Sequence, residues 1–298
     1  MTGAPIQPPL SAPIALEPRF AVARGLRMRY LEWPGGAPPI VLLHGLSANA
    51  NEFAAVGTAL SPRFRVVAPD LRGRGGTDKP ASGYTMADHA ADVISLLDTL
   101  GIDRVVLGGH SFGAFLAIYI AVHYPARVSR IVVIDAAMRV NPRVREMLAP
   151  SLGRLRRTFA SADAYLEEIR HAPYMDGTWD WAMESYFRAE IVTDSDGSVR
   201  SATSADAIAQ SMSEVLGEPW ADLIVRVPHP TLLVNAPADY GPPGAGAIVP
   251  EENARETAQM FRDARYVQVA GNHLTMVFGA HAPVLASEIA AFAAGAER

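Results

Sequence analysis

The sequence predicts an α/β fold in which helices cover both faces of a mainly parallel sheet. Strand-like apolar runs alternate with helical patterns through the first half of the chain. Runs such as residues 39–43 and 131–134 contain no charged residue, which is typical of strands buried on both faces. With 49% hydrophobic and 19% charged residues among 298, the chain has the composition of a globular protein with a sizeable core.

Each element follows from a local pattern. Residues 86–100 carry apolar side chains at helical spacing and end before Gly101, and residues 112–124 form a helical stretch that Pro125 ends. A last helix is expected at residues 282–294. Strands are expected at residues 20–23 and 26–31 (an opening hairpin), 39–43, 64–68, 104–108, 131–134, 231–234 and 266–269.

One long segment interrupts this alternation. Residues 137–226 contain helical stretches and no convincing buried strand, and they hold three of the four tryptophans. Strand patterns return after it, so we expect a helical insertion into a single sheet. Residues 19–136 and 227–298 then form the core, and residues 1–18, rich in Pro and Ala, are expected to be a flexible arm.

Composition excludes several classes of protein. The chain has no cysteine, which rules out disulfides, a thiol nucleophile and thiolate metal sites. A net charge of −5 argues against nucleic-acid binding, and the longest apolar runs are too short to cross a membrane. The N-terminus lacks the pattern of an export signal, so a cytoplasmic location is expected. No metal or organic cofactor is implied, and no sequence feature marks an oligomer interface.

A serine occupies the motif Gly109-His-Ser-Phe-Gly113, directly after one predicted strand and directly before a helix. In that context a tight turn exposes the hydroxyl of Ser111, and the glycines allow neighbouring backbone to approach. The start of the helix also favours developing negative charge. We expect Ser111 to be a nucleophile; the alternative is a serine that only caps the helix.

Acyl transfer by a serine also needs an oxyanion hole, a base, and an acid that orients the base. A His-Gly-Leu motif follows a strand, and the backbone N–H groups of Leu46 and Phe112 are expected to bind the oxyanion. His44 in this motif is expected to be structural. The base comes late in the chain order, and His273 follows the last strand in a glycine-containing loop.

On these motifs the chain resembles the α/β-hydrolase fold serine hydrolases, from about residue 20 onward. The resemblance implies a mainly parallel eight-stranded sheet with a helical cap, residues 137–226, inserted after the sixth strand. The family usually has His at the position of Arg74 and Ser at that of Gly76, both structural positions. Within the family the chain resembles (E)-2-(acetamidomethylene)succinate hydrolase-like members in particular. The likeness to these members is clearest at residues 44–49, at residues 61–84 and in the 24-residue step from Ser111 to Asp135, whereas the family as a whole is matched at His44-Gly45, residues 70–78, Gly109 to Gly113 and Gly271-Asn-His273.

Two aspartates compete for the role of the acid. Asp239 follows the strand at 231–234, where most members of the family carry the acid, but the loop after it is stretched by glycines and prolines. Asp135 follows the preceding strand, where some members, including the nearer relatives, place it. We favour Asp135, with Asp239 as the alternative; either can instead be a loop or capping residue.

The predicted cap suggests a substrate site. Trp179 and Tyr186 are candidates to line an apolar pocket, although packing within the cap explains them equally well. Arginine guanidinium groups suit a carboxylate, and Arg139 is our candidate among them; the alternative is a solvated helix face. The arginines near the start of the cap are Arg139, Arg143, Arg145, Arg154, Arg156 and Arg157.

Together these features predict a serine hydrolase of a small-molecule ester, lactone, thioester or amide. Carbon–carbon bond hydrolysis on the same triad is one alternative. A ligand-binding, receptor-like member with little turnover is another. A serine at position 111 argues against epoxide or haloalkane chemistry, because members with those activities resemble this chain but carry aspartate there.

Overall fold

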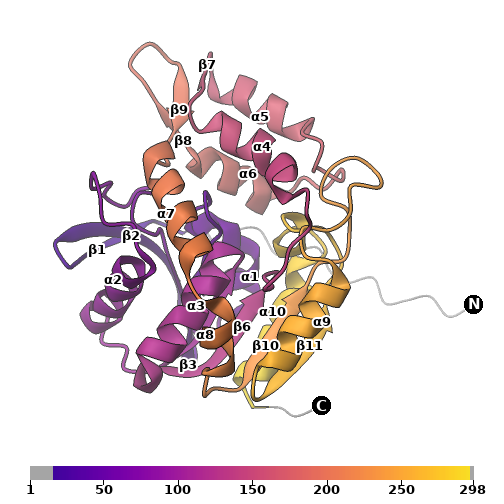
Figure 1. Ribbon diagram of the computed structural model, residues 1–298. Helices are drawn as coiled ribbons and strands as arrows, with labels where there is room; N and C mark the ends of the chain where they lie inside the picture. The colour runs from indigo at the N-terminus through magenta and orange to yellow at the C-terminus, as the bar shows by residue number, and fades with distance from the viewer. Residues whose placement is uncertain (1–15, 296–298) are drawn as a thin grey trace, which may run out of the picture.

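A computed structural model describes residues 16–295, and it contains one large sheet of eight strands (Figure 1). Only β2 runs against the other seven. Most of the segment predicted to be an arm lies outside the described residues. In spatial order the strands are β1 (Arg19–Ala23), β2 (Leu26–Trp33), β4 (Phe64–Pro69), β3 (Gly36–Leu43), β5 (Val105–His110), β6 (Val128–Ile134), β10 (Thr231–Asn235) and β11 (Ala264–Gln268). The mainly parallel eight-stranded sheet expected from the sequence is therefore confirmed.

Helices cover this sheet in two groups. The helix α1 (Ala54–Leu60) packs against α10 (Ala282–Ala293). A second layer consists of α2 (Met86–Thr99), α3 (Phe112–His123), α8 (Trp220–Val225) and α9 (Glu251–Met260), each contacting the next (Figure 1). The interior strands β5 and β10 are buried along their whole length, which explains why neither contains an acidic or basic residue other than His110 and why each has an apolar stretch.

The register of the central strands places several loops at one edge of the sheet. His110, the last residue of β5, pairs with Ile134, the last residue of β6, and Ile134 pairs with Val234 of β10. Since these strands are parallel, the residues that follow them leave the sheet side by side. This edge is where ligands bind in open α/β sheets.

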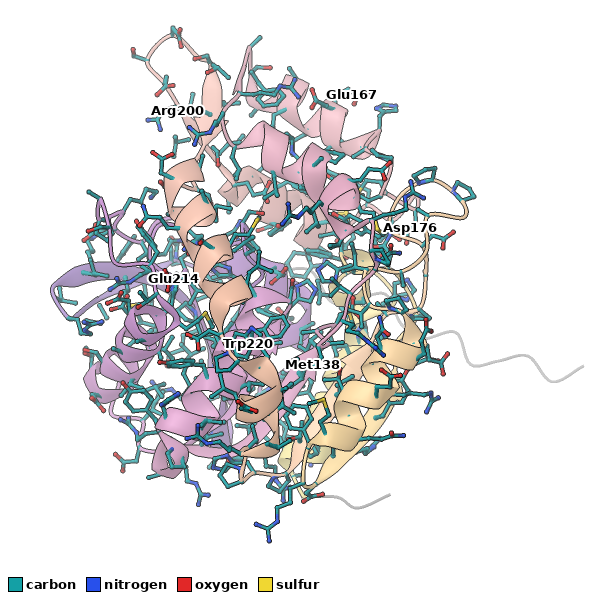
Figure 2. The ribbon with its side chains drawn as sticks, viewed as in Figure 1. Met138, Glu167, Asp176, Arg200, Glu214 and Trp220 are labelled. Carbon is teal, nitrogen blue, oxygen red and sulfur yellow. The ribbon has the colours of Figure 1, made fainter. Side chains whose placement is uncertain are left out.

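Between β6 and β10 the chain forms a separate layer above the sheet. In Figure 2, Met138 marks where the chain leaves the sheet, and Trp220 marks where it returns. The helices of this layer are α4 (Val144–Arg154), α5 (Ala162–Arg170) and α6 (Trp181–Ala189), and α7 (Ala205–Gly217) runs from it along the core, where it contacts α2 (Figure 1). We call residues 137–226 the inserted segment.

The inserted segment also contains a small antiparallel sheet that the sequence pattern did not predict. Its strands are β7 (Thr158–Phe159), β9 (Val199–Ser201) and β8 (Ile191–Thr193), in that spatial order. Strands of two or three residues are too short to show an alternating pattern, so only the turn around Gly197 leaves a sequence signal.

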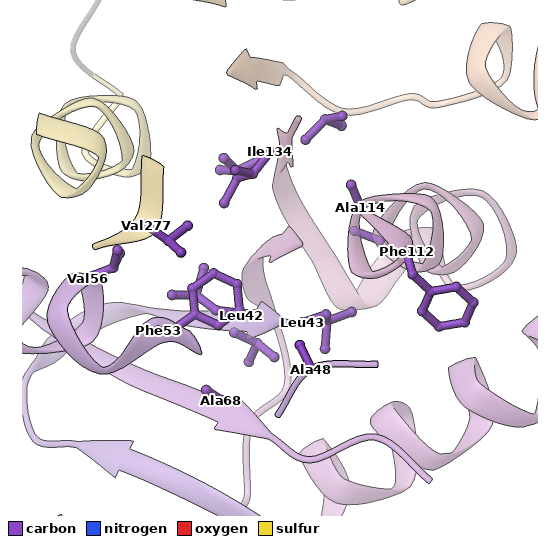
Figure 3. Packing of buried hydrophobic residues seen from close by; sticks show 14 of the residues in the cluster. Leu42, Leu43, Ala48, Phe53, Val56, Ala68, Phe112, Ala114, Ile134 and Val277 are labelled. Carbon is purple, nitrogen blue, oxygen red and sulfur yellow. The ribbon is translucent and has the colours of Figure 1, made fainter. Parts of the chain in front are cut away.

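The core forms one continuous cluster of buried side chains. Figure 3 shows its centre, where Leu42 and Leu43 of β3 lie near Phe53 and Ile134. Buried residues of the inserted segment, including Leu166 and Phe187, belong to the same cluster. Within residues 16–295, no helix is both long and apolar enough to cross a membrane.

Candidate active site

Ser111 lies at the junction between β5 and α3 in a strained backbone conformation. Its φ is +53° and its ψ is −116°, a region that residues other than glycine rarely occupy. The turn is tight enough that a Cβ on Gly109 would lie 2.0 Å from the carbonyl oxygen of Gly113. A Cβ on Gly113 would lie 2.0 Å from the carbonyl oxygen of Leu43. Both glycines are therefore required for the sharp turn that presents the serine.

Asp135 follows β6 as Ser111 follows β5, and it also has a positive φ, +47°. One carboxylate oxygen accepts hydrogen bonds from the side chain of Asn235 at 3.0 Å and from the backbone N–H of Ala236 at 2.9 Å. The other oxygen lies 2.7 Å from Nδ1 of His273. Because this nitrogen donates to the carboxylate, the opposite nitrogen of the ring is left as a proton acceptor.

Asp239 lies elsewhere. Its exposed carboxylate accepts hydrogen bonds from the backbone N–H groups of Gly244 at 2.6 Å and Gly246 at 3.0 Å. These contacts close the glycine-rich loop that follows β10. The structure thus places Asp135 against the imidazole of His273, and it gives Asp239 a role in shaping the loop.

The two backbone N–H groups expected to bind an oxyanion both lie near Ser111. Phe112 is the first residue of α3, so its N–H has no acceptor within the helix. Leu46 lines the same cavity as Ser111, and its carbonyl oxygen accepts a 3.0 Å hydrogen bond from the buried Arg74. The guanidinium of Arg74 also lies 5.4 Å from the ring centroid of Phe112. Arg74 therefore contacts both Leu46 and Phe112 and helps to fix their positions. His44, which was expected to be structural, accepts a hydrogen bond from the backbone N–H of Leu71 at 2.9 Å.

A second buried pair lies beside the first, and sequence reasoning missed it. His110 Nδ1 is 2.9 Å from a carboxylate oxygen of Glu52, and the ring of His110 lies 4.5 Å from that of His273. The other carboxylate oxygen of Glu52 accepts from the backbone N–H of Gly45, just before Leu46, at 3.0 Å. Nothing in the sequence around Glu52 indicates that its carboxylate is buried.

Burial and charge act differently on the two rings. Burial is the largest single effect on both rings, and by itself it favours the neutral form of each. For His110 the attraction and hydrogen bond of Glu52, together with the charge of Asp135, outweigh burial, so the net shift raises its pKa. For His273 the nearby His110 adds to burial, and Asp135 offsets this only in part, so its pKa is lowered. His273 is accordingly neutral at pH 7 and able to accept a proton.

Ser111 and His273 open into a cavity of about 80 Å³ between the sheet edge and the inserted segment. Tyr186 lines it, as the sequence suggested. Arg139 does not reach the cavity: its side chain is 66% exposed and pairs with Glu256 on α9. The other lining residues are Gly45, Leu46, Ser47, Ala48, Glu52, His110, Leu148, Ser151, Leu152, Arg154, Tyr174, Phe187, Glu190, Tyr240 and Leu274.

Trp179 is likewise not one of the described residues that line the cavity. Its indole N–H donates to Glu184 at 3.1 Å, and its ring stacks on Phe187 with 5.8 Å between centroids. Phe187 in turn lines the cavity. Trp179 therefore supports the cavity wall through its contact with Phe187.

Comparison with known proteins is consistent with this geometry. The model of the α/β hydrolase fold family matches residues 38–280. The crystal structure of an E-2-(acetamidomethylene)succinate hydrolase superimposes with a TM-score of 0.80 at 23% identity, covering 94% of this chain and 99% of that one.

Curated relatives match over shorter stretches. A 2-(acetamidomethylene)succinate hydrolase of Mesorhizobium japonicum (strain LMG 29417 / CECT 9101 / MAFF 303099) is 39% identical over 101 residues, 34% of this chain and 36% of that protein. A soluble epoxide hydrolase of Corynebacterium sp. (strain C12) is 34% identical over 162 residues, 54% of this chain and 51% of that protein. The matched region thus spans about a third to a half of these relatives.

Proposed function

Because this chain belongs to the α/β hydrolase fold family, we propose that it is a serine hydrolase that cleaves an acyl bond of a small molecule through Ser111, His273 and Asp135. One observation carries the proposal. The 2.7 Å contact between Asp135 and Nδ1 of His273 orients a neutral imidazole in the cavity that also contains the strained Ser111.

The reaction follows from these parts. His273 accepts the proton of the Ser111 hydroxyl as the oxygen attacks the substrate carbonyl. The N–H groups of Leu46 and Phe112 stabilise the negative charge that develops on the carbonyl oxygen. The imidazolium, held by Asp135, then gives its proton to the leaving alcohol, thiol or amine. Water activated by His273 hydrolyses the acyl-enzyme and restores the serine.

The inserted segment acts as a cap that selects the substrate. Side chains from both sides enclose the cavity, with Ser111 and His273 below and residues such as Tyr186 and Arg154 above. A volume of about 80 Å³ favours a small acyl group. The likeness to an epoxide hydrolase does not extend to its chemistry in our proposal, since position 111 is a serine and not the aspartate expected for that reaction.

The test is intact-mass analysis after exposure to a fluorophosphonate, which modifies serines that a neighbouring base activates. We expect a single adduct on the wild type and none on Ser111→Ala. Folded wild-type protein that forms no adduct would contradict the proposal and favour a ligand-binding member with little turnover. Circular dichroism of both proteins supplies the control for folding.

A further inference from the structure

An arginine of the inserted segment is buried in the wall of the cavity. Arg154, the last residue of α4, is only 8% exposed. It lines the cavity that contains Ser111 and also an adjoining pocket of about 20 Å³. The two spaces share Ser47, Ser151, Arg154 and Glu190, so Arg154 lies where they meet.

The guanidinium of Arg154 lacks the partners that other buried arginines have. It donates one long hydrogen bond, 3.3 Å, to the carbonyl of Pro150, and its Nε is buried without an acceptor. Among residues 16–295 no carboxylate lies within 4.0 Å of it. By contrast, the buried Arg72 forms a hydrogen bond to Asp92 at 2.9 Å, and Arg74 donates to two backbone carbonyls.

Further hydrogen-bond donors surround this arginine. The hydroxyl of Tyr174 is buried and has no partner among the described residues. The hydroxyl of Ser151 forms one long hydrogen bond, 3.4 Å, with that of Tyr240. A buried positive charge beside unused donors is unfavourable unless an acceptor completes the site, so this wall is built for a ligand that carries oxygen acceptors.

The nearest acidic side chain does not fill that role. Glu190 accepts the hydroxyl hydrogen bond of Tyr165 and lies beyond ion-pair distance of Arg154. Burial raises the pKa of Glu190, although Arg154 acts in the opposite direction, so its neutral form is favoured relative to an exposed glutamate. Four tyrosines surround Arg154 and Glu190: Tyr165, Tyr174, Tyr186 and Tyr240. A tyrosine is already uncharged at pH 7, and burial raises the pKa of each of these four further. The other titratable groups that line the cavity are Glu52, His110 and His273.

We propose that Arg154, with the hydroxyls of Tyr174 and Ser151, binds a carboxylate carried by the substrate. The planar guanidinium matches two carboxylate oxygens, and a singly charged group suits a small cavity that also contains Glu190 better than a dianionic phosphate does. The substrates are then acyl compounds with a free carboxylate away from the bond that is cleaved. This substrate class rests on the proposed function; the binding site itself does not.

Two esters of equal chain length test the proposal: mono-4-nitrophenyl glutarate, which has a free carboxylate, and 4-nitrophenyl pentanoate, which has none. We expect wild-type kcat/KM to favour the glutarate about 10- to 100-fold, the value of a charge-assisted hydrogen bond in a buried site. In Arg154→Gln this ratio should fall towards one. Arg156→Gln is the matched control, since Arg156 is 69% exposed, pairs with Asp206 at the surface, and should keep the wild-type ratio.

A wild type without preference for the glutarate, or a preference that survives in folded Arg154→Gln, overturns the proposal. If wild type cleaves neither ester, calorimetry with monomethyl glutarate and dimethyl glutarate separates the two questions. Tighter binding of the monomethyl ester, lost in Arg154→Gln, supports the carboxylate site even though the hydrolase proposal has failed. Equal or no binding overturns it. If Arg154→Gln does not fold, the wild-type comparisons and Arg154→Lys still test the carboxylate site. Lysine keeps the positive charge but loses the planar guanidinium, so we expect Arg154→Lys to weaken the preference for the free carboxylate.

Discussion

At the scale of single residues, the clearest prediction separates the two candidate acids. Asp135→Asn should lower kcat/KM by about 10⁴-fold, because an amide at this position favours the wrong tautomer of His273. Asp239→Asn should change it little, since that side chain only accepts backbone hydrogen bonds in an exposed loop. Steady-state kinetics on both variants, with melting temperatures as the control for folding, check this. The opposite ranking would show that Asp239 orients the base.

This choice also shows what spacing along the chain cannot reveal. Both aspartates follow buried strands, so each was a reasonable acid from sequence alone. The difference depends on the register that pairs His110 with Ile134 and on the positive φ of Asp135, neither of which leaves a sequence signal. Ser111 and His273 were easier to predict from the sequence. Ser111 lies in the motif Gly109 to Gly113, and His273 is expected late in the chain order of serine, acid and histidine.

The pH dependence of the reaction follows from His273. Its pKa lies below the usual 6.5, first because of burial and then because of the neighbouring His110. Only the neutral imidazole accepts the serine proton, so kcat/KM should fall as the pH drops through the pKa of the free enzyme and stay level above it. The acid limb for 4-nitrophenyl pentanoate, measured where both forms of nitrophenol absorb equally, should therefore have a midpoint below 6.5. A midpoint above 6.5 would contradict the neutral base.

At the scale of elements, the turn between β5 and α3 depends on a glycine that touches a neighbouring strand. Gly113→Ala would bring a methyl group to 2.0 Å from the carbonyl of Leu43, backbone that cannot move without disturbing β3. We expect a loss of several kcal/mol in the free energy of unfolding, about 3 or more, as for other overpacked core sites. Chemical denaturation measures it.

Gly153→Ala is the matched control for that substitution. Gly153 lies in α4, and an added Cβ meets no atom within 4 Å. Alanine should raise the stability of the protein by up to about 1 kcal/mol, because it is the better helix former. Equal effects of the two substitutions would mean that the contact with Leu43 does not constrain the turn.

Elements differed in how readily the sequence predicted them. The eight strands of the large sheet were all expected, because burial on both faces produces apolar runs in interior strands such as β3 and β6, and because the opening hairpin and the last strand have strand-like sequences. The three strands of the small sheet were missed because each is two or three residues long. Contacts inside the inserted segment, such as those around Arg154, depend on how its short helices pack, and hydrophobic periodicity does not specify that packing.

At the scale of the whole molecule, hydrogen bonds and a shared core join the inserted segment to the loops of the catalytic edge. Asn272, next to His273, donates to the carbonyl of Tyr174 at 2.9 Å. Thr275 donates to Asp176, labelled in Figure 2, at 2.8 Å. Asn51, next to the cavity residue Glu52, donates to Ser185 at 2.9 Å. These hydrogen bonds therefore fix the position of the inserted segment relative to the loop that carries His273.

This attachment predicts that the inserted segment and the sheet unfold together. Trp179 and Trp181 lie in the part of the inserted segment above the sheet, whereas Trp33 is buried in β2 and Trp220 packs against Phe115 of α3. Tryptophan fluorescence therefore reports on both parts and would show an early step if the inserted segment unfolded first, and far-UV circular dichroism reports on the whole chain. In urea the two signals should change with the same midpoint, because one continuous core joins both parts. Asn272→Ala should shift both midpoints downward together, by about 1–3 kcal/mol in the free energy of unfolding, as it removes buried hydrogen bonds. A fluorescence transition at lower urea than the circular dichroism transition would mean that the inserted segment unfolds independently of the sheet. The arrangement of residues around Ser111 would then have to form again each time the inserted segment refolds.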